Sequence, residues 1–147
     1  MEYDHTQKGH FYLIMWVVAS FCFVNGWVFR NESIAMYTCW GVALIMVLVG
    51  ASFKTLTVCD MRDELDVRFG PIPLFGTRIR YEDIQSVAVD HTKWLDGWGI
   101  HWVPGRGMTY NIWGFDCVRV QVGSKTIRVG TDDPQNLCEF LQQRLPK

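Results

Sequence analysis

The chain has 147 residues, of which 49% are hydrophobic and 14% aromatic; this is room for one modest domain and is rich in apolar residues for a small soluble protein. The formal net charge of −1 gives no strong field for polyanions, so no nucleic-acid partner is expected. The five cysteines form no C-x-x-C pair, and such an odd, scattered set is typical of reduced thiols rather than of a disulfide framework.

Two uncharged apolar runs, residues 11–29 and 33–53, lie near the start of the chain. Each has about the length that a helix needs to cross a bilayer, about 20 residues. Only three residues separate the runs, so they predict an antiparallel transmembrane hairpin within residues 1–53. A cleaved signal peptide is disfavoured by the acidic start MEYDHTQKGH. A buried hairpin of a soluble protein is the other alternative, and the lack of a polar face on either run argues against it.

The orientation of the hairpin is predicted from its flanking charges. Lys8, Lys54 and Arg62 lie on the side of the termini, whereas Arg30 lies alone in the turn. Because positive residues are enriched on the cytoplasmic side of membrane proteins, both termini are expected in the cytoplasm.

Polar and small residues within the two runs predict how the helices touch. Asn25 is expected to make an interhelical hydrogen bond near the turn, where Gly26 permits a close approach, and Gly41 is expected to make a close contact from the second helix. A transport or proton pathway is the functional alternative for Asn25. Neither run contains an ionisable side chain of the kind that marks such a pathway.

From residue 54 onwards the hydrophobic period changes to two, which predicts strands. TLTVCD, ELDVRF, TRIRY and DIQSVAVD are expected strands, PIPLFG is a connection because of its prolines, and the slip between Ile84 and Val87 predicts a bulge. CVRVQVGSKTIRVGT predicts a hairpin with its valines inward and with Arg119 and Arg128 outward. Residues 133–145 predict an amphipathic helix with Asp133 as its N-cap and Pro134 at its first position.

The stretch TKWLDGWGIHWVPGRGMTYNIWG, residues 92–114, holds four of the seven tryptophans. It predicts a β-hairpin in which Trp98, Ile100 and Trp102 share one face. Packing of these rings in the core is the favoured interpretation, a protein-contact surface is the second and dipping into a membrane is the third. The candidate contact residues are Trp94, His101, Arg106 and Trp113, with Arg106 at the tip of the hairpin.

Three segments, YEDIQSV at 81–87, GWGIHWVPGRGMTYNIWG at 97–114 and IRVGTDDPQNL at 127–137, resemble the bacterial pleckstrin-homology-like domains of small two-span membrane proteins. The resemblance covers roughly residues 54–145. It implies an α+β membrane protein of the bacterial inner membrane, whose residues 54–147 form a cytoplasmic domain. That domain would be a seven-stranded, strongly bent antiparallel β-barrel or sandwich capped by a C-terminal helix. The resemblance implies no enzyme activity.

No catalytic, cofactor or metal site is predicted from the residues. His91 and His101 lack ligand spacing, and GWGIHWVPGRG lacks the ending of a phosphate loop. A specific phosphoinositide site is not expected, because the loop DMRDE has Arg62 alone among acids. The outward arginines could form a basic stripe, but nearby acids favour a mixed surface.

These observations predict a non-enzymatic protein that is held in the lipid bilayer. It would self-assemble as a homo-oligomer or hold an unidentified protein partner at the membrane as a scaffold. The alternative is an oligomeric membrane pore or a transporter-accessory subunit.

Overall fold

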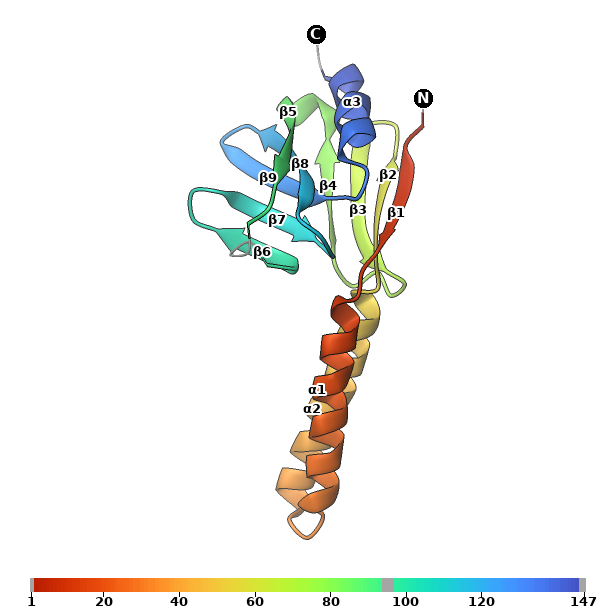
Figure 1. Ribbon diagram of the computed structural model, residues 1–147, viewed down its shortest axis with the longest axis vertical. Coiled ribbons are helices and arrows are strands. Elements are labelled where there is room, and N and C mark those ends of the chain that lie inside the picture. Colours follow the sequence, from red (N-terminus) through yellow and green to blue (C-terminus); the bar gives the residue numbers. More distant parts are fainter. Residues whose placement is uncertain (1, 94–96, 146–147) are drawn as a thin grey trace.

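The computed structural model describes residues 2–93 and 97–145. A hairpin of two long helices projects from one end of a β domain, and the C-terminal helix lies at the opposite end (Figure 1). The elements in chain order are β1 (Asp4–Lys8), α1 (Phe11–Val28), α2 (Ser33–Ser52), β2 (Thr55–Asp60), β3 (Glu64–Gly70), β4 (Gly76–Arg80), the 3-10 turn η1 (Tyr81–Asp83), β5 (Ile84–His91), β6 (Gly99–Val103), β7 (Gly107–Asn111), β8 (Asp116–Val122), β9 (Lys125–Gly130) and α3 (Pro134–Arg144).

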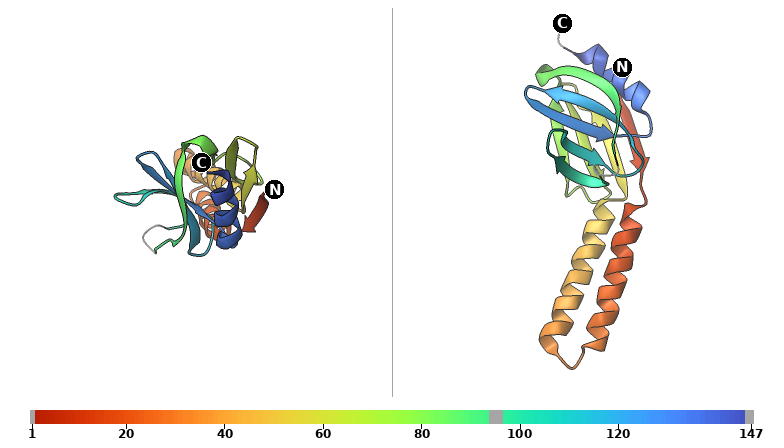
Figure 2. Two further views of the ribbon diagram at one scale, coloured as in Figure 1. Left: turned by 90° about the horizontal axis from the view of Figure 1, so that it is seen from above. Right: turned by 60° about the vertical axis from the view of Figure 1, so that its left-hand side comes forward.

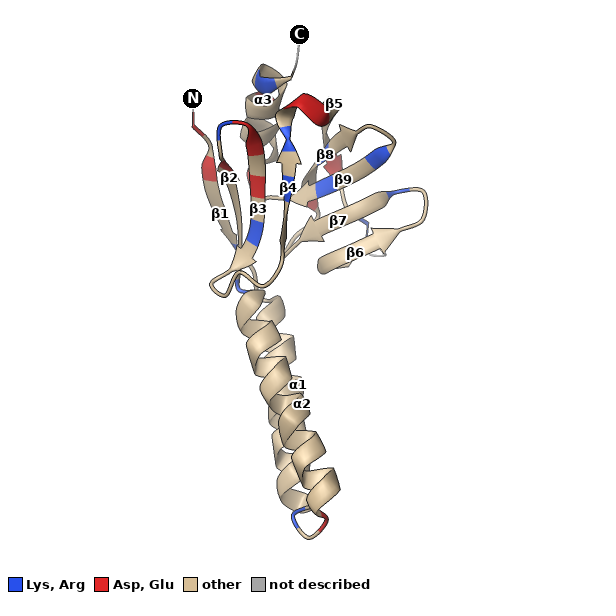
Figure 3. Ribbon diagram, turned by 180° about the vertical axis from the view of Figure 1, so that it is seen from behind, with Lys and Arg blue, Asp and Glu red and all other residues tan. Residues whose placement is uncertain are grey.

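The two apolar runs form the helices α1 and α2, and both are long and apolar enough to cross a membrane. Charged residues are confined to the β domain and to the turn between the helices (Figure 3). Most side chains of α1 and α2, including Val17, Phe21 and Ile34, point away from the rest of the protein. A helix in the core of a soluble protein would bury such residues, so their exposure argues against a soluble helical hairpin.

Two reciprocal tryptophan–glycine contacts hold α1 against α2. The ring of Trp40 on α2 covers Gly26 on α1, and the ring of Trp16 on α1 covers Gly50 on α2. Each indole N–H then donates to a carbonyl of the facing helix, from Trp16 to Val47 at 3.4 Å and from Trp40 to Phe23 at 3.3 Å. Glycine is needed at both positions because a Cβ would meet the indole ring within 3.0 Å.

The other two predicted interhelical contacts differ in the structure. The side-chain amide of Asn25 donates to the carbonyl of Phe21 in its own helix at 2.8 Å, so it does not bridge to α2. Gly41 is exposed, and a Cβ at Gly41 would meet no other atom within 4 Å. The helical rotation of α2 directs Gly50 and Ala43 towards α1, which leaves Gly41 on the outer face.

The first sheet, sheet A, has the strand order β1-β2-β3-β4, and all of its pairings are antiparallel. Its predicted strands β2, β3 and β4 are confirmed, and their inward residues Leu56, Leu65 and Ile79 are buried. Strand β1 was not predicted, because the polar sequence DHTQK shows no apolar alternation. It pairs along its whole length with β2, so residues 4–8 belong to the β domain although they precede the helices.

The second sheet, sheet B, has the strand order β5-β8-β9-β7-β6. The predicted bulge is confirmed as a register shift between Ile84 and Ser86. The hairpins β6–β7 and β8–β9 are antiparallel as predicted, but β7 and β9 pair in parallel. Sequence periodicity gave no sign of this pairing, because it joins strands that are not consecutive in the chain.

Within the described residues the two sheets do not close into a barrel: four strands form sheet A and five form sheet B. Of the expected seven-stranded bent barrel or sandwich, the barrel is therefore wrong, while the α+β composition and the C-terminal helix are confirmed. Figure 2 shows α3 over the end of the β domain that lies away from the hairpin. The core contains fully buried side chains from both sheets and from α3, namely Leu65, Val67, Phe69, Val118, Val120, Leu137 and Leu141.

Helix α3 begins at Pro134, with Asp133 at the N-cap position. The predicted side-chain cap is absent: the Asp133 carboxylate accepts a hydrogen bond from the Asn136 side chain, not from a backbone N–H of the helix. At the other end of α3, Arg144 pairs with the buried Asp60 of β2 at 2.5 Å. Asp60 also accepts the hydroxyl hydrogen of Tyr81 at 2.9 Å, which ties α3 to sheet A.

The tryptophan–glycine contacts predict opposite effects for two glycine substitutions in the hairpin. Gly26→Ala places a Cβ against Trp40 and should destabilise the pairing of α1 and α2 by about 1–3 kcal/mol, the range for overpacking. Gly41→Ala meets no neighbour and should be neutral or stabilising by up to about 1 kcal/mol, because alanine favours helices. Unfolding of the full chain in increasing dodecyl sulfate, followed by circular dichroism, measures both. Equal changes in unfolding for the two variants would contradict the contact between Gly26 and Trp40.

Candidate functional site

The face of sheet B towards the core continues outward as a partly exposed apolar surface. Met108 and Tyr110 of β7 are in register with Ile127 and Val129 of β9. On the other side of β7, Trp102 and Ile100 of β6 stand opposite Met108 and Tyr110. Burial falls along this row, from the fully buried Val129 to Trp102, which is 68% exposed. We call the outer part of this surface, Ile100, Trp102, Met108, Tyr110 and Ile127, the Trp102 face.

A groove of about 580 Å³ lies on the Trp102 face. Its apolar wall comes from Trp102, Met108, Tyr110 and Ile127. Ser124 in the turn between β8 and β9, and Lys125 and Thr126 at the start of β9, also line it. A large aromatic ring beside a cleft with a polar rim is typical of protein–protein contacts, in which a few tryptophan, tyrosine and arginine side chains contribute most of the binding energy.

Strand β6 forms the edge of sheet B beside this groove, and among the described residues it has fewer protective charges or bulges than the other edge strands. Unpaired strand edges attract other strands, so proteins usually guard them with charges or bulges. Strand β1 carries Asp4 and Lys8, β4 carries two arginines, and β5 has the bulge near Ser86. The sequence of β6, GIHWV, contains no lysine, arginine, aspartate or glutamate.

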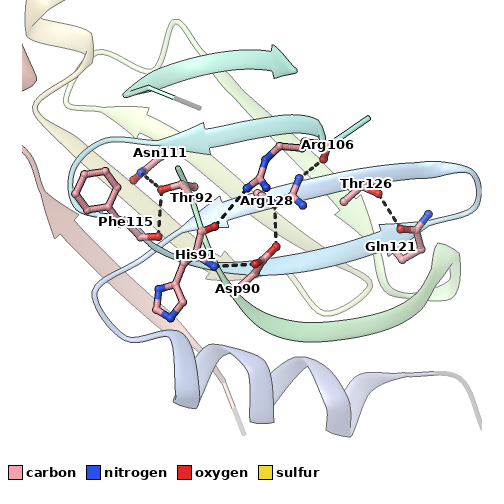
Figure 4. Close-up of polar contacts among 9 residues, drawn as sticks. All are labelled: Asp90, His91, Thr92, Arg106, Asn111, Phe115, Gln121, Thr126 and Arg128. Carbon is pink, nitrogen blue, oxygen red and sulfur yellow. Dashed lines mark hydrogen bonds and ion pairs between the residues drawn. The ribbon is translucent and has the colours of Figure 1, made fainter. Parts of the chain in front are cut away.

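The opposite face of sheet B carries a polar network that clamps the turn between β6 and β7 (Figure 4). The Arg128 guanidinium pairs with Asp90 of β5 at 3.0 Å and also donates to the carbonyl of Arg106. The side chain of Arg106 donates to the carbonyl of His91 at 3.3 Å. Arg128 was predicted to point into solvent, but it is only 5% exposed because the turn and the end of β5 lie over it.

The Asp90 carboxyl is held ionised by this network. Its partial burial raises its pKa, but the backbone N–H of His91 and the Arg128 guanidinium outweigh this effect. The pKa of Asp90 is therefore lowered from its ordinary value. The negative charge of Asp90 offsets the positive charge of Arg128, which would otherwise be costly to bury.

Asn111 at the end of β7 organises the neighbouring turn and is fully buried. Its side-chain amide donates to the carbonyl of Gly114 at 3.0 Å, and its side-chain oxygen accepts from the N–H of Trp113 at 3.2 Å. A Cβ at Gly130 would lie 2.3 Å from this oxygen, so glycine is required there. The backbone N–H of Thr92 donates to the carbonyl of Phe115 at 2.7 Å, which attaches the end of β5 to the same turn.

Of the four predicted contact residues, the three that the structure describes do not form one surface. Trp94 lies outside the described residues. His101 is exposed on the face of β6 opposite to Trp102, and Arg106 is engaged in the polar clamp. The ring of Trp113 is partly exposed and stacks on Trp98 with the ring centroids 4.5 Å apart.

The core placement predicted for Trp102 is wrong, and Trp98 is only half-buried. The Trp98 indole N–H donates to the carbonyl of Gly114 at 3.3 Å, so this ring supports the turn after β7. The alternation in GIHWV shows that the strand has two faces, but it does not show that β6 is an edge strand. At an edge the inner face of a strand is not fully covered by the core, and for this reason Trp102 is exposed.

Comparison of the chain with family models, with curated proteins and with solved structures finds no match. The resemblance to pleckstrin-homology-like domains therefore stays a prediction. The function has to be argued from the geometry of the chain itself.

The clamp predicts a loss of stability for Asp90→Asn, which leaves Arg128 buried without its counter-charge. We expect a loss of about 1–3 kcal/mol near neutral pH, less than for a fully buried pair because Asp90 is partly exposed. Since the pKa of Asp90 is lowered on folding, its contribution is present above its unfolded pKa of about 3.9 and is lost as the pH falls through the folded value.

The stability difference between the parent and Asp90→Asn should therefore narrow below about pH 4. Thermal unfolding of the full chain in mild detergent across a pH series measures this difference. Asp63→Asn, at an exposed position between β2 and β3, is the matched control and should change little at any pH. A stability difference between the parent and Asp90→Asn that stays constant in acid would contradict an ionised Asp90 paired with Arg128.

Proposed function

We propose that this protein is a non-enzymatic interaction module anchored in the bacterial inner membrane. The hairpin of α1 and α2 spans the bilayer, and the Trp102 face of the β domain binds protein. Its first partner is a second copy of the same chain, so the protein acts as a self-assembling scaffold at the membrane.

The observation that carries this proposal is the exposure of Trp102 beside a groove, on a strand that forms the edge of sheet B. Leaving a tryptophan in water is unfavourable, because a large apolar area stays hydrated. Covering Trp102, Tyr110 and Met108 by a partner would remove this area from water. The polar clamp behind the sheet keeps the surface rigid before binding, which lowers the ordering cost of association.

Two features favour a second copy as the partner. Strand β6 lies at the end of the β domain next to the hairpin (Figures 1 and 2), and a Cβ at Gly99 would lie 3.8 Å from Phe53 at the end of α2. Every anchored copy would therefore present β6 at the same height above the membrane. Position 41 lies on the outer face of α2, where a small residue, glycine or alanine, leaves room for a helix of another copy to approach.

The orientation with both termini in the cytoplasm is part of the proposal. It is supported by Lys8 and Lys54 at the domain end of the hairpin, against Arg30 in the turn. The thiols of Cys59 and Cys138 in the β domain are free, which suits a reducing compartment.

This orientation predicts that a reporter that is active only in the cytoplasm will be active when fused after Lys147. The physical reason is the retention of positively charged flanks on the cytoplasmic side. A reporter that is active only in the periplasm should be silent at the same position and active when inserted at Asn31 in the turn. The reversed pattern would refute the orientation and leave the hairpin intact.

Self-assembly through the Trp102 face predicts that Trp102→Ala will lower the oligomeric mass of the full chain without lowering its stability. The parent should have the mass of two or more protomers by light scattering in mild detergent, and the variant should shift towards the monomer. Its melting temperature should stay close to that of the parent, because changes at exposed positions usually cost under about 0.5 kcal/mol.

Met61→Ala is the matched control, since Met61 is also an exposed apolar residue, 48% exposed, in the turn between β2 and β3. It should leave the mass unchanged. A monomeric parent at every protein concentration would refute self-assembly. An oligomer that survives Trp102→Ala would show that another surface holds the copies together.

A further inference from the structure

The connection between β3 and β4, residues 71–75 with the sequence PIPLF, is an apolar loop on the surface. Leu74 is 59% exposed and Phe75 is 37% exposed, and the loop contains no charged residue. Nothing in the proposed protein-binding surface uses this loop, because it belongs to sheet A and the Trp102 face belongs to sheet B. Consecutive exposed apolar residues mark a surface that meets an apolar partner.

The loop lies at the end of the β domain from which the helices leave (Figure 1). Gly70, directly before the loop, pairs with Thr55, which follows α2 almost directly. The N–H of Lys54 also donates to the carbonyl of Gly70 at 3.1 Å. The ring of Phe75 stacks on that of Phe53 at the end of α2, with the ring centroids 5.3 Å apart. The loop is therefore level with the domain end of the hairpin.

Side chains beside Lys54 indicate where the membrane surface would lie. The Lys54 ammonium is 5.4 Å from the ring centroid of Tyr12 and 5.8 Å from that of Trp16. Tyrosine and tryptophan rings together with lysine typically lie at the boundary between the hydrocarbon core and the headgroups. Because the N–H of Lys54 is hydrogen-bonded to the carbonyl of Gly70, the apolar loop begins at the same depth in the membrane as Lys54.

The backbone of the loop is suited to a partly dehydrated environment. Pro71 and Pro73 have no N–H group, and the N–H of Leu74 donates to the carbonyl of Ile72 at 2.8 Å. The carbonyl of Phe75 accepts from the N–H of Phe69 at 2.9 Å. Unsatisfied backbone groups are costly in lipid, so these features lower the cost of placing the loop among headgroups and acyl chains.

Charges next to the loop do not oppose this contact. Asp66, which lines the groove beside Leu74 and Phe75, is paired with Arg68 at 3.6 Å and with Arg78 at 3.4 Å. The exposed guanidinium groups of Arg68 and Arg78 suit the phosphates of lipid headgroups.

We propose that residues 71–75 insert Leu74 and Phe75 into the interface of the lipid bilayer. This inference rests on the proposed membrane anchor. The loop is a contact with the membrane in addition to the two helices, and it prevents the β domain from swinging about the hairpin. It thereby holds strand β6 at a constant height above the membrane, where copies of the chain meet.

Photocrosslinking of the full chain in nanodiscs of phosphatidylcholine tests the proposal. Benzoylphenylalanine is introduced singly in place of Leu74, Met61 or Leu44, all of which are exposed apolar residues. Met61 lies at the far end of the β2–β3 hairpin from the loop, and Leu44 lies in α2, so they are the solvent and the lipid controls. Mass spectrometry measures the lipid adduct after irradiation, and each variant must melt like the parent before it is used.

The lipid adduct at position 74 should exceed that at position 61 by several-fold and approach that at position 44. A yield at 74 no higher than at 61, with a lipid adduct at 44, would overturn the loop proposal and leave the anchor standing. Crosslinks from 74 to protein in place of lipid would also overturn it. If position 44 gives no lipid adduct, the membrane anchor itself fails and the loop proposal fails with it.

Discussion

The architecture depends on one constraint: the hairpin of α1 and α2 is inserted between two strands that are hydrogen-bonded to each other. Lys8 at the end of β1 pairs with Thr55 at the start of β2, and the N–H of Gly9 donates to the carbonyl of Lys54 at 3.0 Å. The antiparallel ladder therefore holds the strand that leads into α1 and the strand that follows α2 one strand spacing apart, about 5 Å. The helices must leave the sheet side by side, which positions the tryptophan–glycine contacts between them.

The same constraint distinguishes the two ends of the β domain. The hairpin occupies one end, so the loop of residues 71–75 and strand β6 lie beside it (Figure 1). Helix α3 covers the other end, where Arg144 and Tyr81 both bind Asp60. Anchoring of the hairpin in a bilayer would therefore place both surfaces near the membrane, and the loop would restrain the tilt of the domain and so keep their height constant.

The two faces of sheet B differ in what covers them: polar contacts fasten one face, and Trp102 stays exposed on the other. On one face, Arg128, Asp90 and Arg106 fasten the turn between β6 and β7 to β5. A buried ion pair contributes little net stability compared with apolar packing, but it requires a specific geometry. The clamp holds the β6–β7 hairpin without covering its apolar face. Trp102 and its groove can thus stay open to a partner while the sheet remains ordered.

Local patterns in the sequence determined the elements whose environment follows from their own residues. The long uncharged runs predicted α1 and α2, strict alternation predicted β3 and β8, the slip in parity predicted the bulge in β5, and Pro134 marked the start of α3. Only the tertiary structure decided the pairing of the polar β1 with β2, the parallel pairing of β7 with β9, the burial of Arg128 and the exposure of Trp102. Alternation states that a strand has two faces, but what covers each face is set by strands and turns distant in the chain. For that reason the sequence alone placed Trp102, which lies on an edge strand, in the core.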